Sequence, residues 1–563
     1  MTEKRLILGQ VDTDFNPELD IPAGPWCFAG AEHVYEGWDE LDFISTFETA
    51  DDIHVDAALC AALVHRKAEM LASEFNQIHR RNYSKRYWST LSTPWLLSMV
   101  QASWISYRHL SKLIEKHERI TVNVVNEEVV WEFREISDIF KRGSLNLSFV
   151  HWLYSMALRH LAPESWTLSK ETFNFPPSPK AWKRGWVRSV FRKILGDRLR
   201  VINLSGAGIL DRFYLSLILY NSDKTEVPPT RNYDTSAAGQ APGSFLNFLD
   251  DVLTATRPYF LGEGYGGFEA KAKKRHYAPG KALVGPDMLG GIEDIFVTAH
   301  AIESGMRVVA VQHGGNYGMV RTDIDAELGE YSQDQFITWG WNEHGDYNGR
   351  FTPLPSPLLS QYHMRHKERR DQLILVSGQH HLVAFRVSSW PQPLQWIEMR
   401  NEKLSFFRGL SKEIFSRTYY RPYFDDGPSL ETRNYFLNQL PSLNIIEDNL
   451  HSAMMTCRLL VLDHPGTTLN LAMAANVPVI CFWKMDAWPE TKEMEGLIKK
   501  LIQVGILYER GDKTAAAITE IWEDVASWWG SAEVQKVRTE FCSKLARSSP
   551  NWRSEWKQAL STI

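Results

Sequence analysis

Short apolar runs that end in polar, glycine-containing loops constrain the fold of this 563-residue chain more than any other feature. From about residue 282 these runs alternate with helical patterns, and the same pattern restarts at residues 373–381. Further runs of this kind occupy residues 443–448, 458–468 and 477–483. Short apolar strands that alternate with helices are typical of parallel sheets covered on both faces. The pattern therefore predicts an α/β fold.

The helical patterns and a proline-rich segment divide the chain into predicted parts. The first 170 residues are mostly helical, with long patterns over residues 56–75 and 95–117, the second preceded by a threonine and a proline suited to a helix start. Residues 352–361 carry three prolines ahead of a charged stretch, which is typical of a linker. We expect an N-terminal α/β domain with helical insertions (1–355), a C-terminal Rossmann-like domain (370–515) and a helical tail (516–563).

The composition predicts an ordinary globular protein. Hydrophobic residues make up 44% and charged residues 23% of the chain, which excludes disorder, collagen and coiled coil as dominant classes. A net charge of −6 is too close to balance for a chain-wide nucleic-acid surface, so we expect no nucleic-acid partner. The five cysteines lack zinc-ligand spacing, which predicts no metal site. Without a secretory signal or a long apolar span, we expect a cytoplasmic protein.

The loop in residues 308–318, VVAVQHGGNYG, is the strongest candidate for chemistry. Its apolar strand delivers His313 to the carboxyl end of a parallel sheet, where open α/β folds bind ligands. A histidine there can act as a general base because its ordinary pKa lies near working pH. The alternative is a histidine that caps an ordinary loop. We expect His313 to be catalytic, and we expect the rest of the loop to line a cleft: Gln312, Gly314, Gly315, Asn316 and Tyr317.

A second polar turn, at residues 463–468, joins a strand to a helix. Backbone N–H groups and two hydroxyls at a helix N-terminus form an anion site that suits a nucleotide phosphate. The alternative is a helix whose threonines satisfy only their own backbone. The donor-binding residues predicted in this turn are Asp463, His464, Gly466, Thr467 and Thr468.

Two weaker motifs are assigned to the same donor site. The glycine loop at residues 377–381, SGQHH, follows a predicted strand, so Gly378 and Gln379 could line the cleft. A surface turn would have the same sequence. Arg421 offers the forked geometry that suits a phosphate or a carboxylate, although an arginine beside a proline at a strand end can also be structural.

The segment at residues 178–200 carries eight Lys or Arg side chains and one acid, with apolar residues at helical spacing. A basic amphipathic helix can lie on an anionic membrane surface. A helix packed on a sheet with a solvated basic face would have the same pattern. A peripheral contact of residues 180–200 with the inner face of the cytoplasmic membrane is one of these two interpretations, and both stay open.

Several segments together resemble a sugar-transferase family found with O-antigen and other surface-glycan genes in bacteria. They are residues 24–28 (GPWCF), 86–96, 311–318, 337–341 and 463–468. The resemblance implies a GT-B-like glycosyltransferase, in which two Rossmann-type domains face a cleft. More distantly, the chain is similar to capsule and teichoic-acid polymer transferases. That likeness implies that His313 lies beside the acceptor hydroxyl and that the 463–468 turn holds the donor.

Two details bear on the donor. The His464–Pro465 pair resembles the HP motif of enzymes that use CMP-activated ulosonic acids, which implies a donor of that class. Many GT-B enzymes have a glutamate in the following helix that binds the ribose, whereas this chain has Asn470 where that residue is expected. The ribose contact and the nucleotide therefore stay open.

Taken together, these features predict a glycosyltransferase that acts on a surface-polysaccharide or O-antigen acceptor, either a glycan or a lipid-linked glycan. The nucleotide-sugar donor is a substrate, and we expect neither a cofactor nor a metal ion. One alternative is a sugar-nucleotide 2-epimerase of the same architecture. The other is a non-catalytic glycan-binding or assembly subunit.

Overall fold

A computed structural model describes residues 4–125, 129–171, 200–221, 235–378, 380–423, 428–446 and 449–562. By internal contacts the chain separates into two units that interleave in sequence. The first comprises Met1–Ile202, Lys224–Val308 and Leu382–Ser389, and the second comprises Asn203–Asp223, Val309–His381 and Trp390–Ile563. The predicted contiguous domains, with boundaries near residues 355, 370 and 515, stay a prediction.

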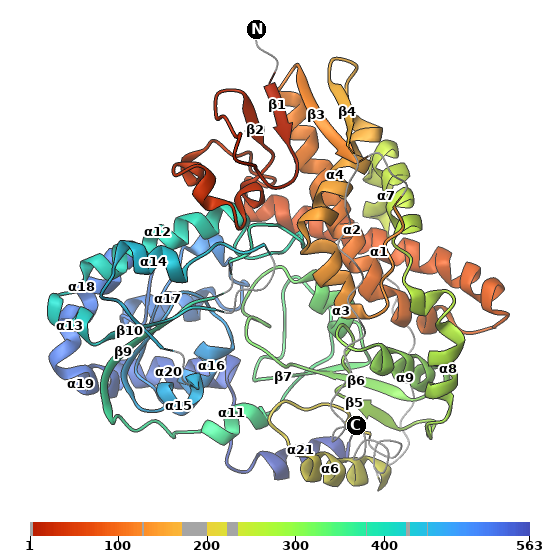
Figure 1. The fold of residues 1–563 in the computed structure, drawn as a ribbon. Helices are drawn as coiled ribbons and strands as arrows, with labels where there is room; N and C mark the ends of the chain where they lie inside the picture. Colours follow the sequence, from red (N-terminus) through yellow and green to blue (C-terminus); the bar gives the residue numbers. More distant parts are fainter. Residues whose placement is uncertain are drawn as a thin grey trace. The chain divides into compact units, whose positions relative to one another are not determined.

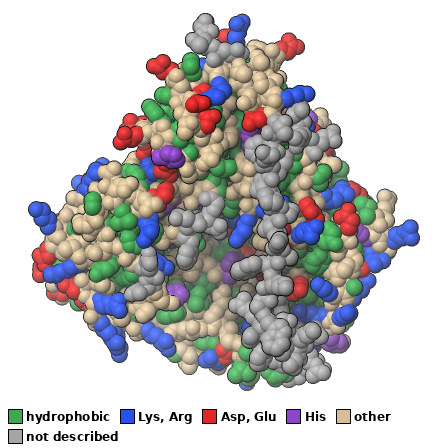
Figure 2. Space-filling model, in the orientation of Figure 1, with side chains coloured by type: hydrophobic (Ala, Val, Ile, Leu, Met, Phe, Trp, Pro, Cys, Tyr) green, Lys and Arg blue, Asp and Glu red, His purple; other side chains and the backbone are tan. Residues whose placement is uncertain are grey.

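The basic segment at residues 180–200 lies outside the described residues except for Arg200, so its membrane contact stays a prediction. Within the described ranges, none of the helices combines the length and the apolar composition that crossing a bilayer requires. On the face drawn in Figure 2, basic and acidic side chains are interspersed.

The first unit contains a parallel sheet in the order β2-β1-β3-β4. The register pairs Arg5 with Asp20 on one side and with Thr121 on the other. Arg5 also donates to the Asp20 carboxylate through Nε and Nη2, each at 2.9 Å. The strands are β1 (Lys4–Ile7), β2 (Asp20–Pro22), β3 (Ile120–Val125) and β4 (Thr167–Glu171).

Two long helices, α1 (Ala50–His79) and α2 (Lys85–Lys116), pack against each other in the first unit (Figure 1). Thr49 begins α1: its hydroxyl accepts from Asp52 N at 3.1 Å, and Thr49 N donates to the Asp52 carboxylate at 3.0 Å. The other helices of this unit are α3 (Ile136–Asp138), α4 (Leu147–Leu161), α7 (Gly243–Ala255), α8 (Tyr265–Lys273) and α9 (Ile292–Glu303).

Helix α2 begins at Lys85, well before the predicted start at residues 93–95. Ser84 is its N-cap, with a hydroxyl that accepts from Tyr87 N at 3.2 Å, and Pro94 lies inside the helix. An interior proline costs about 3 kcal/mol. Trp88 and Trp95 beside it are at most 1% exposed, and burying a large apolar side chain contributes roughly 1.5–3 kcal/mol. Packing therefore outweighs the proline.

The second unit contains a six-stranded parallel sheet in the order β11-β10-β9-β12-β13-β14. Counted from β9 along the chain, this is 3-2-1-4-5-6, the strand order of the Rossmann fold. The order reverses between β9 and β12, which pair directly. The strands are β9 (Arg370–Val376), β10 (Thr418–Arg421), β11 (Asn444–Ile445), β12 (Cys457–Leu462), β13 (Val479–Phe482) and β14 (Leu507–Tyr508).

Both faces of this sheet are covered, as the apolar strands require. Leu373 and Leu375 of β9 belong to a core with side chains of α12 (Pro393–Gly409) and α18 (Gly511–Ile521), two helices that lie side by side (Figure 1). The alternate residues Ile374 and Val376 belong to a second core, with α16 (Thr467–Ala475), α17 (Glu495–Gln503) and α20 (Ala532–Leu545). The predicted α/β class is confirmed.

The chain passes from the first unit to the second within β6 (Arg307–Val311), in a sheet of order β5-β6-β7-β8. In the first unit, Arg307 N donates to Lys281 O at 2.9 Å, beside β5 (Ala282–Val284). In the second, β6 pairs with β7 (Gln335–Thr338), and β7 pairs with β8 (Phe351–Pro353). The predicted linker at residues 352–361 instead holds part of β8 and most of α11 (Pro357–Tyr362).

The remaining helices of the second unit include the predicted helical tail. They are α6 (Ile209–Asn221), α10 (Ile324–Ala326), α13 (Lys412–Ser416), α14 (Arg433–Gln439), α15 (Leu450–Met454), α19 (Val525–Gly530) and α21 (Trp552–Leu560).

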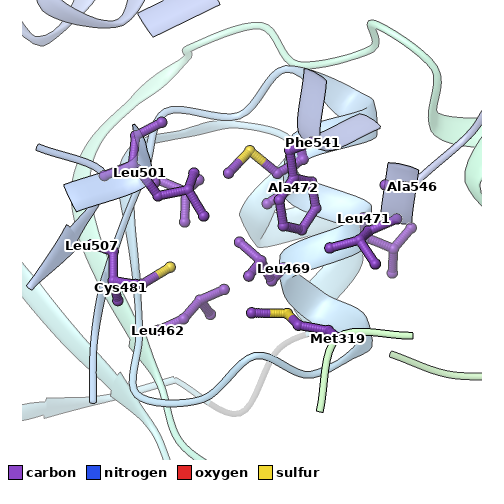
Figure 3. Close-up of a cluster of buried hydrophobic side chains, with 14 of the residues drawn as sticks. Met319, Leu462, Leu469, Leu471, Ala472, Cys481, Leu501, Leu507, Phe541 and Ala546 are labelled. Atoms are coloured by element: carbon purple, nitrogen blue, oxygen red, sulfur yellow. The ribbon is translucent and has the colours of Figure 1, made fainter. Parts of the chain in front are cut away.

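An apolar core fixes α16. Figure 3 shows Leu469, Leu471 and Ala472 of this helix among side chains of β12, β13, α17 and α20, with Met319 from the loop after β6 beside them. These four side chains are at most 5% exposed. Because close-packed side chains resist displacement, the first turn of α16 has a fixed position.

Candidate functional site

The carboxyl ends of β9 and β12 lie side by side where the strand order reverses, since their last residues are register partners. Doubly wound folds bind ligands at this switch point. The residues that follow the two strands are Ser377, Gly378, Asp463 and His464. The structure thus brings Gly378 and the 463–468 turn together, while Gln379 lies outside the described residues.

Asp463 is the centre of a buried hydrogen-bond network. One carboxylate oxygen accepts from Gly378 N at 2.9 Å and from His464 Nδ1 at 2.7 Å. The other accepts from Ser377 Oγ at 2.7 Å and from Lys403 Nζ at 2.9 Å. Asp463 and Lys403 are each 0% exposed, so this is a fully buried ion pair whose carboxylate is well supplied with donors.

The charges of this network follow from burial and from the ion pair. Burial alone would raise the pKa of Asp463, yet the Lys403 ammonium and the His464 ring hold it well below its ordinary value. Burial lowers the pKa of Lys403, and the Asp463 carboxylate opposes that effect. Burial and the neighbouring ammonium lower the pKa of His380 well below its ordinary value. His380 is therefore a neutral ring whose Nε2 accepts from Lys403 Nζ.

His464 is oriented by Asp463 and turns its other nitrogen toward the start of α16. Its Nε2 would lie 2.8 Å from a Cβ placed at Gly466. The side chain is 14% exposed, and among the described residues Nε2 has no hydrogen-bond partner. A ring fixed in this way offers Nε2 as an acceptor when it is neutral, and as a donor to a ligand phosphate at the helix start when both nitrogens are protonated.

The loop after β6 contacts the first turn of α16 directly. Gly315 N donates to Thr467 Oγ1 at 2.8 Å. A Cβ on Gly315 would lie 2.5 Å from the Gly466 carbonyl carbon and 2.6 Å from Thr467 N, so only glycine allows this approach. The predicted cleft loop and the predicted donor turn therefore meet inside the second unit.

Neither threonine of the turn caps its own helix. The N-cap of α16 is Gly466, which gives no side-chain cap. The Thr467 hydroxyl accepts from Gly315, and the Thr468 hydroxyl has no hydrogen-bond partner within the described part of the chain. The alternative in which the threonines bind only the backbone of their own helix is therefore not observed in the described residues. The Thr468 hydroxyl is available to a ligand.

His313 is the exposed end of a hydrogen-bond chain that leads to a buried carboxylate. Its side chain is 60% exposed, and its Nε2 lies 2.8 Å from Tyr317 Oη and 3.3 Å from Glu330 Oε1. Tyr317 Oη donates to Glu330 Oε2 at 2.6 Å. Burial and the Glu330 carboxylate raise the pKa of Tyr317 well above its ordinary value, so the phenol stays protonated. A histidine oriented through a phenol by a carboxylate suits proton transfer.

The other residues of the loop after β6 shape it. Gln312 is 2% exposed; its Oε1 accepts from Trp339 N at 2.8 Å and from Trp341 Nε1 at 3.1 Å, and its Nε2 donates to Gly314 O at 2.9 Å. Asn316 has φ +74°, a conformation that asparagine tolerates better than most residues. Gln312 thus ties the loop to the end of β7.

Arg421, a predicted donor-binding residue, and Asn470 both form hydrogen bonds within the protein. Arg421 Nη1 donates to Ile446 O at 2.9 Å at the carboxyl end of β10. Asn470, at the position expected for a ribose-binding glutamate, is 5% exposed, and its Nδ2 donates to Leu545 O at 2.8 Å. Asn470 therefore joins α16 to α20.

Sequence reasoning missed Lys403 and Glu330. Helix α12 buries Trp396, Arg400, Lys403 and Phe407, which recur at helical spacing. Two cations in an apolar stripe were a signal of buried charge in the sequence. Glu330 carries no such signal, because its partner lies 13 residues away across a turn.

Within the described ranges, no group of three or more His, Cys, Asp or Glu side chains is arranged to hold a metal ion.

Comparisons with known proteins give one family match. The model described as LIC12162 family transferase matches residues 4–560. Among solved structures, a mutant O-GlcNAc transferase of Thermobaculum terrenum is similar, with 11% identity and a TM-score of 0.29; the match covers 92% of this chain and 100% of that one. No curated protein matches the chain.

Proposed function

Since the chain belongs to the LIC12162 family of transferases, we propose that it is a GT-B-type glycosyltransferase that moves a sugar from a nucleotide-activated donor to a surface-glycan acceptor. One observation supports this most. The switch point of a sheet with Rossmann order carries the Asp463–His464 pair, and the loop of His313 is hydrogen-bonded to the helix that starts there.

The donor phosphate binds at the start of α16. The N-terminus of a helix carries a partial positive charge that favours anions. His464 Nε2 and the Thr468 hydroxyl are two polar groups at this end that have no hydrogen-bond partner among the described residues. The Thr468 hydroxyl can donate to the charge that develops on the leaving nucleotide, and His464 Nε2 can do so when the ring is protonated on both nitrogens, with Nδ1–H facing the Asp463 carboxylate.

His313 accepts the proton of the attacking hydroxyl. The acceptor oxygen forms a bond to the anomeric carbon of the sugar, and the bond from that carbon to the donor phosphate oxygen breaks. The electron pair leaves with the nucleotide, and the hydroxyl proton passes to the imidazole. Glu330 Oε1, 3.3 Å from His313 Nε2, stabilises the imidazolium that forms.

The resemblance of His464–Pro465 to the HP motif makes a CMP-linked ulosonic acid the first donor to test. A glycan or lipid-linked glycan of the O-antigen type is the matching acceptor.

The test is a donor assay on the wild-type chain. Sugars activated by CMP, CDP, UDP, GDP or dTDP are incubated with and without a surface-glycan acceptor, and nucleotide release and acceptor mass are followed. We expect one donor to release its nucleotide and lengthen the acceptor by one sugar. An epimerised nucleotide sugar, formed without an acceptor, would contradict the proposal and favour a 2-epimerase.

A further inference from the structure

Lys403 is a fully buried ammonium at the carboxyl ends of β9 and β12. Its Nζ donates to Asp463 Oδ2 at 2.9 Å, to Ser377 Oγ at 2.8 Å and to His380 Nε2. Its side chain is 0% exposed, so a substrate at the switch point cannot touch it. Any effect of Lys403 on the chemistry must pass through its neighbours.

We infer that Lys403 is a positioning residue of the transfer site, which holds Asp463 so that Asp463 fixes the His464 ring with Nδ1 protonated and Nε2 turned to the start of α16. This role rests on the proposed function, because His464 matters for transfer only if the donor binds beside it. The orientation of the ring can nevertheless be measured without any donor.

The other groups around Asp463 cannot replace Lys403. Ser377 and Gly378 are neutral donors, and His380 is a neutral ring that accepts from Lys403. Without the ammonium, burial favours a protonated Asp463, which no longer accepts the His464 Nδ1 proton as a carboxylate does. The ring would then lose both the partner that fixes its orientation and the negative charge that supports a doubly protonated ring, and its single proton could move to Nε2.

A buried ion pair is a poor device for stability alone. Removing two charges from water costs several kcal/mol per ion, and apolar replacements of similar volume are often as stable. The pair formed by Lys403 and Asp463 also holds His464, whose Nε2 has no hydrogen-bond partner among the described residues. A positioning role accounts for both observations.

The test compares Lys403→Met, which keeps the length of the side chain and removes its charge, with Arg408→Met. Arg408 is an exposed residue of the same helix, where it donates to Gln439 Oε1 at 2.8 Å. Nitrogen NMR of the His464 ring reports which nitrogen carries the proton. We expect the Nδ1–H form in the wild type and in Arg408→Met, and a shift toward Nε2–H or a mixture in Lys403→Met.

Turnover gives the second readout. At metal sites, loss of the partner that orients a histidine ligand typically lowers activity about 10- to 100-fold. We expect the kcat of Lys403→Met to fall by a similar factor, with a smaller change in KM. If Lys403→Met does not fold, the double variant Lys403→Met/Asp463→Asn removes both charges. We expect it to fold with turnover still low, because an amide replaces the carboxylate that orients His464.

Three results would overturn the role of Lys403: a wild-type His464 protonated only at Nε2, a folded Lys403→Met with wild-type ring signals and kcat, or a double variant with full turnover. A wild-type chain that transfers no sugar, yet shows the expected ring signals, would contradict the proposed function and leave the positioning role intact.

Discussion

The amide of Gly315 and the hydroxyl of Thr467, 152 positions apart in the sequence, are joined by a hydrogen bond of 2.8 Å. This bond connects the loop that carries His313 to the helix that starts at the switch point. The candidate base and the candidate phosphate site therefore lie in two segments that contact each other directly.

Gly315→Ala should break this contact. The added Cβ would lie 2.5 Å from the Gly466 carbonyl carbon, so the loop must move, and overpacking of this kind costs about 1–3 kcal/mol. We expect a lower thermal midpoint and a loss of transfer. The control is Gly496→Ala, whose Cβ meets no atom within 4 Å and which should raise helix stability by about 1 kcal/mol. Equal midpoints and activities for the two variants would contradict the contact.

His313→Ala should abolish transfer and leave the fold intact, because the side chain is 60% exposed. A general base contributes about 10²- to 10⁴-fold, so kcat should fall by that factor while nucleotide binding is kept. Glu330→Gln should give a smaller loss, since it weakens the orientation of the ring and keeps the ring itself. His363→Ala, also at an exposed histidine of the second unit, is the control. Wild-type kcat in His313→Ala would remove this residue from the mechanism.

Asp463→Asn should destabilise the second unit strongly. It leaves Lys403 buried without a counter-charge, which costs about 3–5 kcal/mol. Asp371→Asn removes a half-exposed carboxylate paired with Arg417 and Arg458, which costs at most about 1 kcal/mol. Urea unfolding at pH 7 compares the two variants.

The difference in unfolding free energy between Asp463→Asn and Asp371→Asn should be lost only at low pH. Because folding lowers the pKa of Asp463 below its ordinary value of 3.8, the carboxylate stabilises the fold above that pH. Its contribution disappears only as the pH falls further, through the folded pKa. The two variants should therefore stay apart down to about pH 4, and similar unfolding midpoints at pH 7 would contradict the buried pair.

Glu327→Gln should stabilise the chain at high pH. Burial and Asp323 raise the pKa of Glu327 to about 7, so the folded state favours the protonated carboxyl. That contribution is complete below the ordinary value of 4.5 and is lost as the pH rises through 7. By linkage the ionised group costs about 3 kcal/mol above pH 7.

Thermal midpoints at pH 5 and pH 8 check this prediction. The gain of Glu327→Gln over the wild type should be larger at pH 8, while the exposed Glu343→Gln should change little at either pH. A gain that is equal at the two values would contradict the raised pKa.

The sequence predicted most of the strands of the six-stranded sheet, because short apolar runs that end in polar loops usually form buried strands in an α/β fold. It gave β10 only as a strand end at Arg421, because Tyr419 and Arg421 are half-buried and the run is therefore not continuously apolar. It also placed the start of α2 too late, since tertiary burial of tryptophans outweighs the local cost of Pro94.

The site was only partly predictable. His313, Asp463 and His464 follow apolar strands, and a parallel sheet places such residues at its carboxyl edge. The residues that bind and orient these side chains lie elsewhere in the chain. Lys403, which donates to Asp463, is 60 positions from it, and the Thr467 hydroxyl accepts a hydrogen bond from Gly315 N. Pairings of this kind depend on packing between elements, which local patterns do not specify.

The most direct test of a donor site at the switch point is a thermal-shift titration with CMP, CDP, UDP, GDP and dTDP. A ligand that binds only the native state stabilises it by about 2.7 kcal/mol at 100 times its Kd. We predict that at least one nucleotide raises the midpoint of the wild type and of His363→Ala, and that His464→Ala loses the shift. No shift with any of the five nucleotides, or an equal shift in His464→Ala, would contradict the account.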